Sequence, residues 1–136
     1  MAATADSLGG HVVVLAADDD RLADAVAALL GAGALVGVVT NNAEAVRRLT
    51  DQVADEGLQP PLMFRADPAD AESWPRIAPH LEQRLGPVDA VVADAASMPT
   101  VADVFGPDLR RRGHGDVLEL ADDVVSAVGR AIRHRP

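Results

Sequence analysis

The feature that most constrains the fold of this chain is a strand–turn–helix pattern over residues 11–34. Residues 12–16 form a continuous apolar run, which is typical of a strand buried on both faces. Apolar residues then recur at helical spacing, at Leu22, Val26, Leu29 and Leu30. The turn between strand and helix carries Asp18, Asp19 and Asp20, whose side chains we expect to cap the helix.

The same alternation continues as far as residue 93. Further apolar runs of strand length occupy residues 35–40, 62–66 and 88–93. The helices between them are predicted to begin at Asn41 or Asn42 and at Asp67, where polar side chains can cap them. Strands and helices that alternate with short connections indicate right-handed crossovers in a parallel sheet. We therefore predict an α/β, Rossmann-like three-layer fold, with a four-stranded parallel sheet of order 3-2-1-4, helices on both faces and a C-terminal helix.

The last third of the chain has a different pattern. Prolines and glycines interrupt residues 97–115, which we predict to be an irregular loop. A C-terminal helix is predicted over residues 116–134, and a fifth strand within residues 113–120, in place of the start of that helix, is the alternative. We predict that residues 1–10 are a flexible lead-in and that residues 11–136 form a single domain.

Composition excludes several classes of function. The formal net charge of −9 argues against nucleic acid or an anionic membrane as the main partner. The chain has no cysteine, so disulfides, thiolate catalysis and thiolate metal sites are excluded. No apolar run reaches the length of a membrane span, and the first ten residues lack the basic and apolar regions of a signal peptide. We therefore expect a cytoplasmic protein.

Three segments together resemble the short-chain dehydrogenase/reductase family. The spacing of HVVVLAADDD and LLGAGALVGVVTNNAEAVRRL is similar to the first βαβ unit of that family. FRADPAD, at residues 64–70, resembles the end of its third strand, so the resemblance implies that Asp67 stands where an aspartate contacts the adenine of NAD(P). LGPVDAVVADAA, at residues 85–96, resembles the fourth strand and its Asn-Asn-Ala-Gly motif. The resemblance covers residues 11–96.

The phosphate-binding turn departs from the family pattern. The family has Thr-Gly-x-x-x-Gly-x-Gly, whose glycines let the backbone approach the pyrophosphate, whereas residues 16–23 contain no glycine. If the three carboxylates face the pyrophosphate at about 4 Å, each like-charge pair costs roughly 4 kcal/mol at an effective dielectric constant of about 20. A helix N-terminus returns about 1 kcal/mol. We therefore expect no bound cofactor, with Asp67 as a vestigial contact.

The catalytic residues of the family are also missing. Its reduction chemistry uses a tyrosine as acid and base and a lysine that lowers the tyrosine pKa, and this chain contains neither residue type. The chain also stops before the strands and helix that would carry them. We predict that it is not a dehydrogenase and that it has no catalytic residues of that kind.

An acidic metal site is one alternative function. In the order 3-2-1-4 the ends of strands one and four are neighbours, so Asp18 or Asp19 would face Asp94. Carboxylate oxygens are suitable ligands for Mg²⁺. The same crevice is the place where a weakly bound nucleotide or other small ligand would lie, as in a sensor domain.

Our main functional prediction is a non-catalytic interaction or structural module. We expect it to form a homo-oligomer or to bind a protein partner, with no nucleic acid or membrane partner. The predicted C-terminal helix carries an apolar stripe that could present such an interface. Its residues are Val117, Leu120, Val124, Val128 and Ile132.

Overall fold

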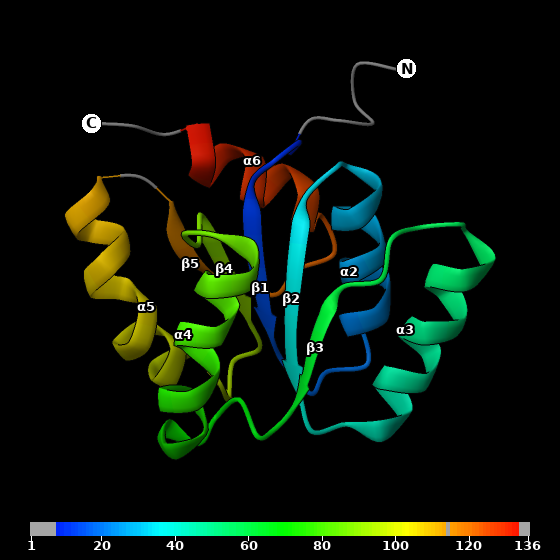
Figure 1. Cartoon of the computed structure of the whole chain (residues 1–136), viewed down its shortest axis with the longest axis horizontal. Helices are drawn as coiled ribbons and strands as arrows, with labels where there is room; N and C mark the ends of the chain where they lie inside the picture. Colours follow the sequence, from blue (N-terminus) through cyan, green and yellow to red (C-terminus); the bar gives the residue numbers. More distant parts are fainter. Residues whose placement is uncertain (1–7, 114, 134–136) are drawn as a thin grey trace.

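The computed structural model describes residues 8–113 and 115–133 and shows a parallel sheet between two layers of helices (Figure 1). The strands are β1 (Val12–Ala16), β2 (Leu35–Thr40), β3 (Leu62–Arg65), β4 (Ala90–Ala93) and β5 (Asp116–Glu119). The helices are α2 (Leu22–Gly31), α3 (Ala43–Asp55), the short 3-10 helix η1 (Ala71–Ser73), α4 (Trp74–Leu85), α5 (Met98–Arg112) and α6 (Val124–Arg133). None of the described helices is long and apolar enough to cross a membrane.

The sheet has five strands in the order β3-β2-β1-β4-β5, and every neighbouring pair is parallel. The α/β class, the parallel sheet and the order of the first four strands are confirmed. The prediction of only four strands is wrong, because Val117 and Leu118 pair in register with Val91 and Val92 of β4. The alternative of a fifth strand within residues 113–120 is therefore the correct one.

The prediction of an irregular loop over residues 97–115 is also wrong, since most of it is helix α5. Pro99 lies in the first turn, where a missing N–H is tolerated, and the helix accommodates Pro107 further along. Val101, Phe105 and Leu109 recur at helical spacing and are buried. Gly113 then ends the helix in the left-handed conformation, at φ 77°.

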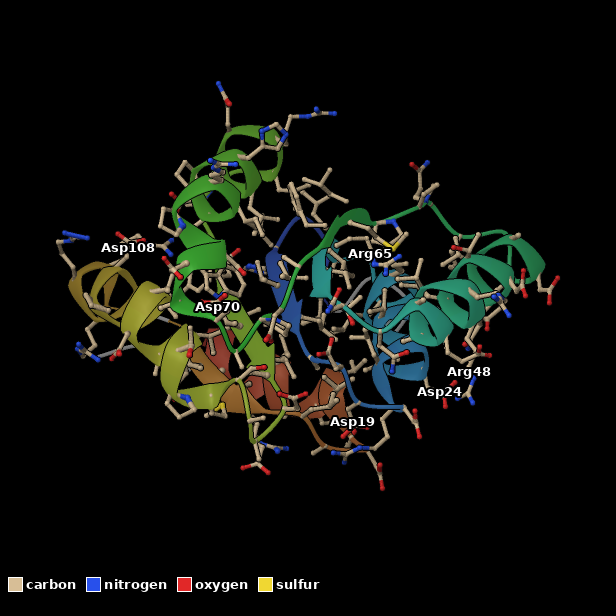
Figure 2. The ribbon with its side chains drawn as sticks, turned by 90° about the horizontal axis from the view of Figure 1, so that it is seen from below. Asp19, Asp24, Arg48, Arg65, Asp70 and Asp108 are labelled. Atoms are coloured by element: carbon tan, nitrogen blue, oxygen red, sulfur yellow. The ribbon has the colours of Figure 1, made fainter. Side chains whose placement is uncertain are left out.

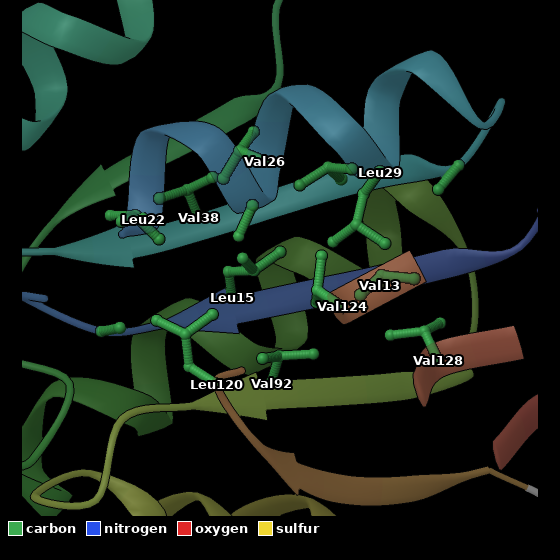
Figure 3. Close-up of a cluster of buried hydrophobic side chains, with 14 of the residues drawn as sticks. Val13, Leu15, Leu22, Val26, Leu29, Val38, Val92, Leu120, Val124 and Val128 are labelled. Carbon is green, nitrogen blue, oxygen red and sulfur yellow. The ribbon is translucent and has the colours of Figure 1, made fainter. Parts of the chain in front are cut away.

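The predicted helix over residues 116–134 divides into β5 and α6, and its last residue lies outside the described part of the chain. Its apolar stripe does not face outwards. Leu120, Val124, Val128 and Ile132 are each less than 5% exposed and belong to the core between the sheet and α2 (Figure 3). Val117 is half-buried and packs against the core on the opposite face. The predicted partner interface is therefore part of the chain's own core.

The other face of the sheet is covered by α4 and α5, and its core contains the aromatic residues. Trp74 is 1% exposed, and its indole Nε1 donates a hydrogen bond to the carbonyl of Pro68 at 3.1 Å. The Trp74 ring meets Phe105 of α5 edge-on, with centroids 5.3 Å apart. These contacts anchor the start of α4 in the core.

The residues before β1 that the structure describes are packed against the fold. Leu8 is 1% exposed, and its N–H donates to the carbonyl of Ala32 at 2.9 Å. Part of the predicted lead-in thus contributes to the core, while residues 1–7 lie outside the described residues.

Candidate functional site

The candidate site lies at the carboxyl end of the sheet, where β1, β2 and β4 end side by side. Residues 17–21, 40–42 and 94–97 meet there, and Figure 2 looks onto this end of the molecule. Open parallel sheets bind ligands at this end, in the crevice where the strand order reverses. In the order β3-β2-β1-β4-β5 that crevice lies between β1 and β4.

Asp18 joins the ends of β1 and β2. Its carboxylate Oδ1 accepts hydrogen bonds from the Thr40 hydroxyl at 2.8 Å and from the Asn41 N–H at 2.7 Å. The side-chain amide of Asn42 donates to the Asp18 carbonyl at 2.8 Å. The Thr40 side chain is buried, so its hydroxyl depends on this acceptor. The Asp18 carboxylate is therefore turned towards β2.

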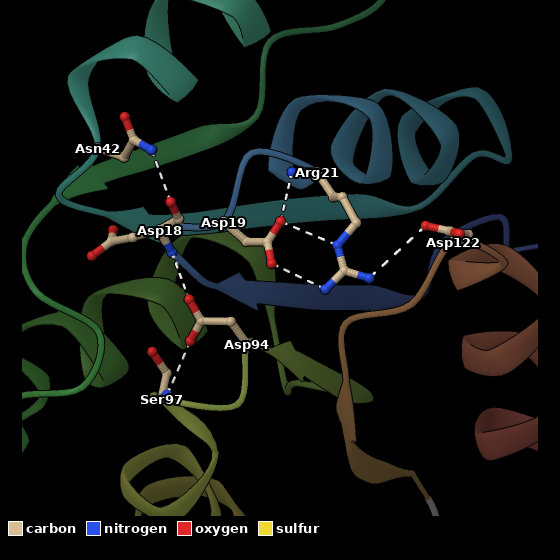
Figure 4. Close-up of polar contacts among 7 residues, drawn as sticks. All are labelled: Asp18, Asp19, Arg21, Asn42, Asp94, Ser97 and Asp122. Carbon is tan, nitrogen blue, oxygen red and sulfur yellow. Dashed lines mark hydrogen bonds and ion pairs between the residues drawn. The ribbon is translucent and has the colours of Figure 1, made fainter.

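Asp94, directly after β4, links that strand to the β1–α2 turn (Figure 4). One carboxylate oxygen accepts from the Asp18 N–H at 2.9 Å, and the other accepts from the Ser97 N–H at 3.0 Å. The first bond occupies a backbone donor in the β1–α2 turn, the region where this kind of fold offers N–H groups to a phosphate. The second bond stabilises the turn that leads into α5.

Asp19 and Arg21 form an ion pair at the start of α2 (Figure 4). The Asp19 carboxylate accepts from the Arg21 backbone N–H at 2.8 Å, from its Nε at 3.1 Å and from its guanidinium NH2 at 3.0 Å. These side-chain and backbone hydrogen bonds lower the pKa of Asp19 below its usual value, and the same contact raises the pKa of Arg21. Arg21 also extends to within 3.9 Å of Asp122, before α6.

The three turn aspartates do not converge on one point, contrary to our expectation. Asp18 points to β2, Asp19 pairs with Arg21, and Asp20 is exposed. Nor do they act together as a cap, because the residue at the N-cap of α2 is Arg21, which has no side-chain cap. Asn42, in contrast, caps α3 as predicted, through bonds from the N–H groups of Glu44 and Ala45.

The arrangement does not favour the predicted magnesium site. Within residues 8–113 and 115–133, no three or more histidine, aspartate or glutamate side chains are grouped so that they could hold a metal ion. Asp18, Asp19 and Asp94 each bind separate N–H groups of the protein. Their oxygens are turned towards these donors and not towards a shared cation.

Asp67, the one residue that the resemblance assigned to a cofactor, has a local role. Its carboxylate accepts from the Ala69 N–H at 2.9 Å, in the turn that follows β3. Asp70 makes the equivalent bond to the Glu72 N–H at 3.0 Å and caps η1. The helix predicted from Asp67 thus begins later, with η1 and α4. Asp67 is exposed, and its contact with a cofactor stays a prediction.

The sequence did not single out Arg21 or Ser97 as parts of this site. Arg21 follows Asp19 by two residues, a spacing that allows a bond to both the backbone and the side chain of Arg21. Ser97 follows Asp94 by three residues, the spacing of a capped turn. Both short-range signals were available, but neither indicates a functional site without the position of the neighbouring strands.

Comparison with known proteins defines the fold. No family model and no curated protein matches the chain. Among solved structures, a citronellol catabolism dehydrogenase from Pseudomonas aeruginosa PAO1 matches with a TM-score of 0.65 at 16% identity, over 93% of this chain and 64% of that one. A 7α-hydroxysteroid dehydrogenase complexed with NADH matches with 0.66 at 19% identity, over 88% and 56%. A short-chain dehydrogenase/reductase from Serratia marcescens matches with 0.53 at 24%, over 65% and 37%.

The structural similarity covers only part of the length of each of these proteins. The chain spans less than two thirds of the length of each of these three proteins. At such sequence identities the likeness concerns the backbone arrangement and not the activity. The chain therefore has the fold of a short-chain dehydrogenase/reductase, over part of the length of those proteins.

Proposed function

We propose that this chain is a non-catalytic module with a short-chain dehydrogenase/reductase fold, which acts through protein contacts and not through hydride transfer. The observation that carries the proposal is the occupation of the carboxyl end of the sheet by the chain's own carboxylates. The backbone N–H groups concerned, each bonded to an aspartate, are those of Asp18, Arg21, Asn41 and Ser97.

A dinucleotide would have to compete with these bonds. Each hydrogen bond to a charged group contributes about 1.5–3 kcal/mol, and a displaced carboxylate would have to find other partners. A pyrophosphate about 4 Å from one of these carboxylates adds a repulsion of roughly 4 kcal/mol at an effective dielectric constant of about 20. The β1–α2 turn has no glycine that would make room for the pyrophosphate. These terms together favour an empty cofactor site.

Calorimetric titration with NAD⁺, NADH, NADP⁺ and NADPH tests the non-catalytic part of the proposal. We expect no saturating heat up to about 1 mM of each dinucleotide, which corresponds to a binding free energy weaker than about −4 kcal/mol. Saturation with a Kd of about 10 μM or below would contradict it. The same titration tests the alternative of a nucleotide sensor in the β1–β4 crevice.

The contact surface must lie away from the stripe that the sequence suggested, because those residues are in the core. The two edges of the sheet differ in character. β5 has the exposed acidic residues Asp116 and Glu119 at its ends, which discourage pairing with another strand. β3 has one charged residue, the exposed Arg65 at its end, and its Met63 is 36% exposed. We place the contact with a second copy or another protein on the β3 edge.

Light scattering over a range of protein concentrations tests self-association at this edge. We expect Met63→Lys to lower the average mass, because it places a charge on the pairing edge. Ser126→Lys adds the same charge at an exposed position of α6 and is expected to leave the mass unchanged. If Ser126→Lys dissociates the assembly and Met63→Lys does not, the contact lies on α6. A monomer at every concentration would exclude self-association.

A further inference from the structure

A hollow lies at the end of the sheet opposite to the candidate site, where β2 and β3 begin. Its volume is about 630 Å³, within the range of about 300–1,000 Å³ that is usual for small-molecule sites. We call it the basal pocket. It is lined by Leu30, Gly33, Ala34, Leu35, Val36, Gly57, Leu58, Gln59, Pro60, Pro61, Leu62, Arg84 and Leu85.

The lining of the basal pocket contains no acidic residue, although the chain has 21 of them. Leu35, at the start of β2, is 44% exposed and is one of two large apolar side chains that are exposed in the described part of the chain. An apolar wall that the protein itself leaves uncovered favours an apolar ligand.

The basal pocket has one cationic group. Arg84, in the last turn of α4, lines the pocket and is exposed. Its guanidinium forms no ion pair or hydrogen bond with another described residue, which is also true of Arg76 at the other end of α4. A guanidinium can bind a carboxylate through two parallel N–H bonds.

Several backbone N–H groups around the basal pocket are already hydrogen-bonded. The N–H groups of Gly57 and Leu58 donate to Ala54 and Val53, at 3.2 and 3.0 Å. The N–H of Leu35 donates to His11 at 2.8 Å, and Pro60 and Pro61 have no N–H to offer. A polar group on a ligand would therefore be bound by side chains, and Arg84 is the charged one.

We propose that the basal pocket binds a small amphiphilic carboxylate, a molecule with one carboxylate head and an aliphatic tail. The head pairs with Arg84, and the tail lies against Leu35, Leu58 and Leu62. This activity is additional to the protein contacts proposed above and does not depend on them. The basal pocket lies at the end of the sheet away from Asp18, Asp19 and Asp94, and no acidic residue lines it.

Calorimetric titration with decanoate, below its micelle concentration, tests the proposal, and decanol serves as the uncharged ligand with the same tail. We expect saturable binding of decanoate with a Kd below about 1 mM and weaker binding of decanol. Arg84→Gln is expected to weaken decanoate binding about fivefold and to leave decanol binding unchanged. Arg76→Gln removes the same charge from an exposed position at the other end of α4 and should have no effect.

Leu35→Asp tests the apolar wall. It places a carboxylate beside the ligand tail and should weaken decanoate binding at least about tenfold. If this variant does not fold, as judged by circular dichroism, Leu35→Ser takes its place. The proposal is overturned if the unmodified protein shows no saturable binding, or if Arg84→Gln and Arg76→Gln bind decanoate equally well. Either result leaves the dinucleotide titration and its conclusion untouched.

Discussion

The two ends of the sheet differ in how their polar groups are satisfied. At the carboxyl end, Asp18, Asp19 and Asp94 accept hydrogen bonds from backbone N–H groups, and those of Asp18 and Asp94 connect the ends of β1, β2 and β4. At the amino end, a hollow of about 630 Å³ is lined mostly by apolar residues, with no carboxylate and with one guanidinium that has no ion pair in the described part of the chain. At the end that binds ligands in this class of fold, backbone N–H groups are thus bonded to the chain's own carboxylates, whereas the other end has an apolar hollow. The fold alone does not determine which end of the sheet offers space for a ligand.

The difference has a physical cause. A parallel sheet with helices that follow its strands directs helix N-termini, with unbonded N–H groups, to its carboxyl end. These groups need an acceptor, from a ligand or from the chain. Here the chain supplies the acceptors as the side chains of Asp19, Asn42 and Asp94. At the amino end the helices finish and the backbone turns, as at Gly57, with φ 65°.

The largest effect is expected from Gly115→Ala, at the amino end. Gly115 has φ 82°, and a Cβ atom there would lie 1.9 Å from the carbonyl oxygen of Asp89. We expect the free energy of unfolding to fall by about 3 kcal/mol or more, measured by urea denaturation. Gly31→Ala is the matched control, since nothing lies within 4 Å of its Cβ position. A small change in Gly115→Ala would show that the amino end is loosely packed.

The next effect concerns Asp18, at the carboxyl end. Asp18→Ala leaves the buried Thr40 hydroxyl and the Asn41 N–H without their acceptor, so we expect a loss of about 2 kcal/mol in urea denaturation. Asp18→Asn keeps an acceptor oxygen and should lose less. Asp20→Ala, at an exposed neighbouring position, should change stability by less than about 0.5 kcal/mol. Equal effects of Asp18→Ala and Asp20→Ala would contradict a structural role for Asp18.

The smallest effect is a pH dependence from Asp19. Hydrogen bonds from Arg21 lower the folded-state pKa of Asp19 below its usual value of 3.8, so ionised Asp19 stabilises the folded state above that pH. This contribution is lost as the pH falls through the lowered value. The melting temperature of the unmodified protein should exceed that of Asp19→Asn from about pH 5 to 7, and the difference should shrink below about pH 4. A difference that grows at low pH would contradict the ion pair.

The first two thirds of the fold could be predicted from the sequence because the signals there are local. Apolar runs, the Asn42 cap and the glycines place the first four strands and their order. The last third was mispredicted because Pro99 and Pro107 indicated a loop more strongly than the spacing of Val101, Phe105 and Leu109 indicated a helix. An apolar stripe, moreover, does not reveal whether it packs inside its own chain or against a partner, as α6 shows.

The location of the candidate site could be predicted from the sequence, but the directions of its side chains could not. The order of the strands brings Asp18 near Asp94, as expected, and they meet through the Asp18 N–H. The direction of each carboxylate depends on groups that are distant in sequence, such as Thr40 and Asn41 for Asp18. The sequence pattern gives the residue types at the strand ends, but the partner of each oxygen follows only from the packed structure.

The difference between the two ends can be tested in one measurement, a ¹⁵N–¹H correlation spectrum of the labelled protein with NADH and, separately, with decanoate. We predict that about 1 mM NADH leaves the amide signals of Asp18, Asp19 and Arg21 unchanged. Decanoate should shift the amides of Leu35, Gly57 and Leu58 in a saturable way. Saturable shifts of the β1–α2 turn with NADH, and none at the basal pocket with decanoate, would contradict the account.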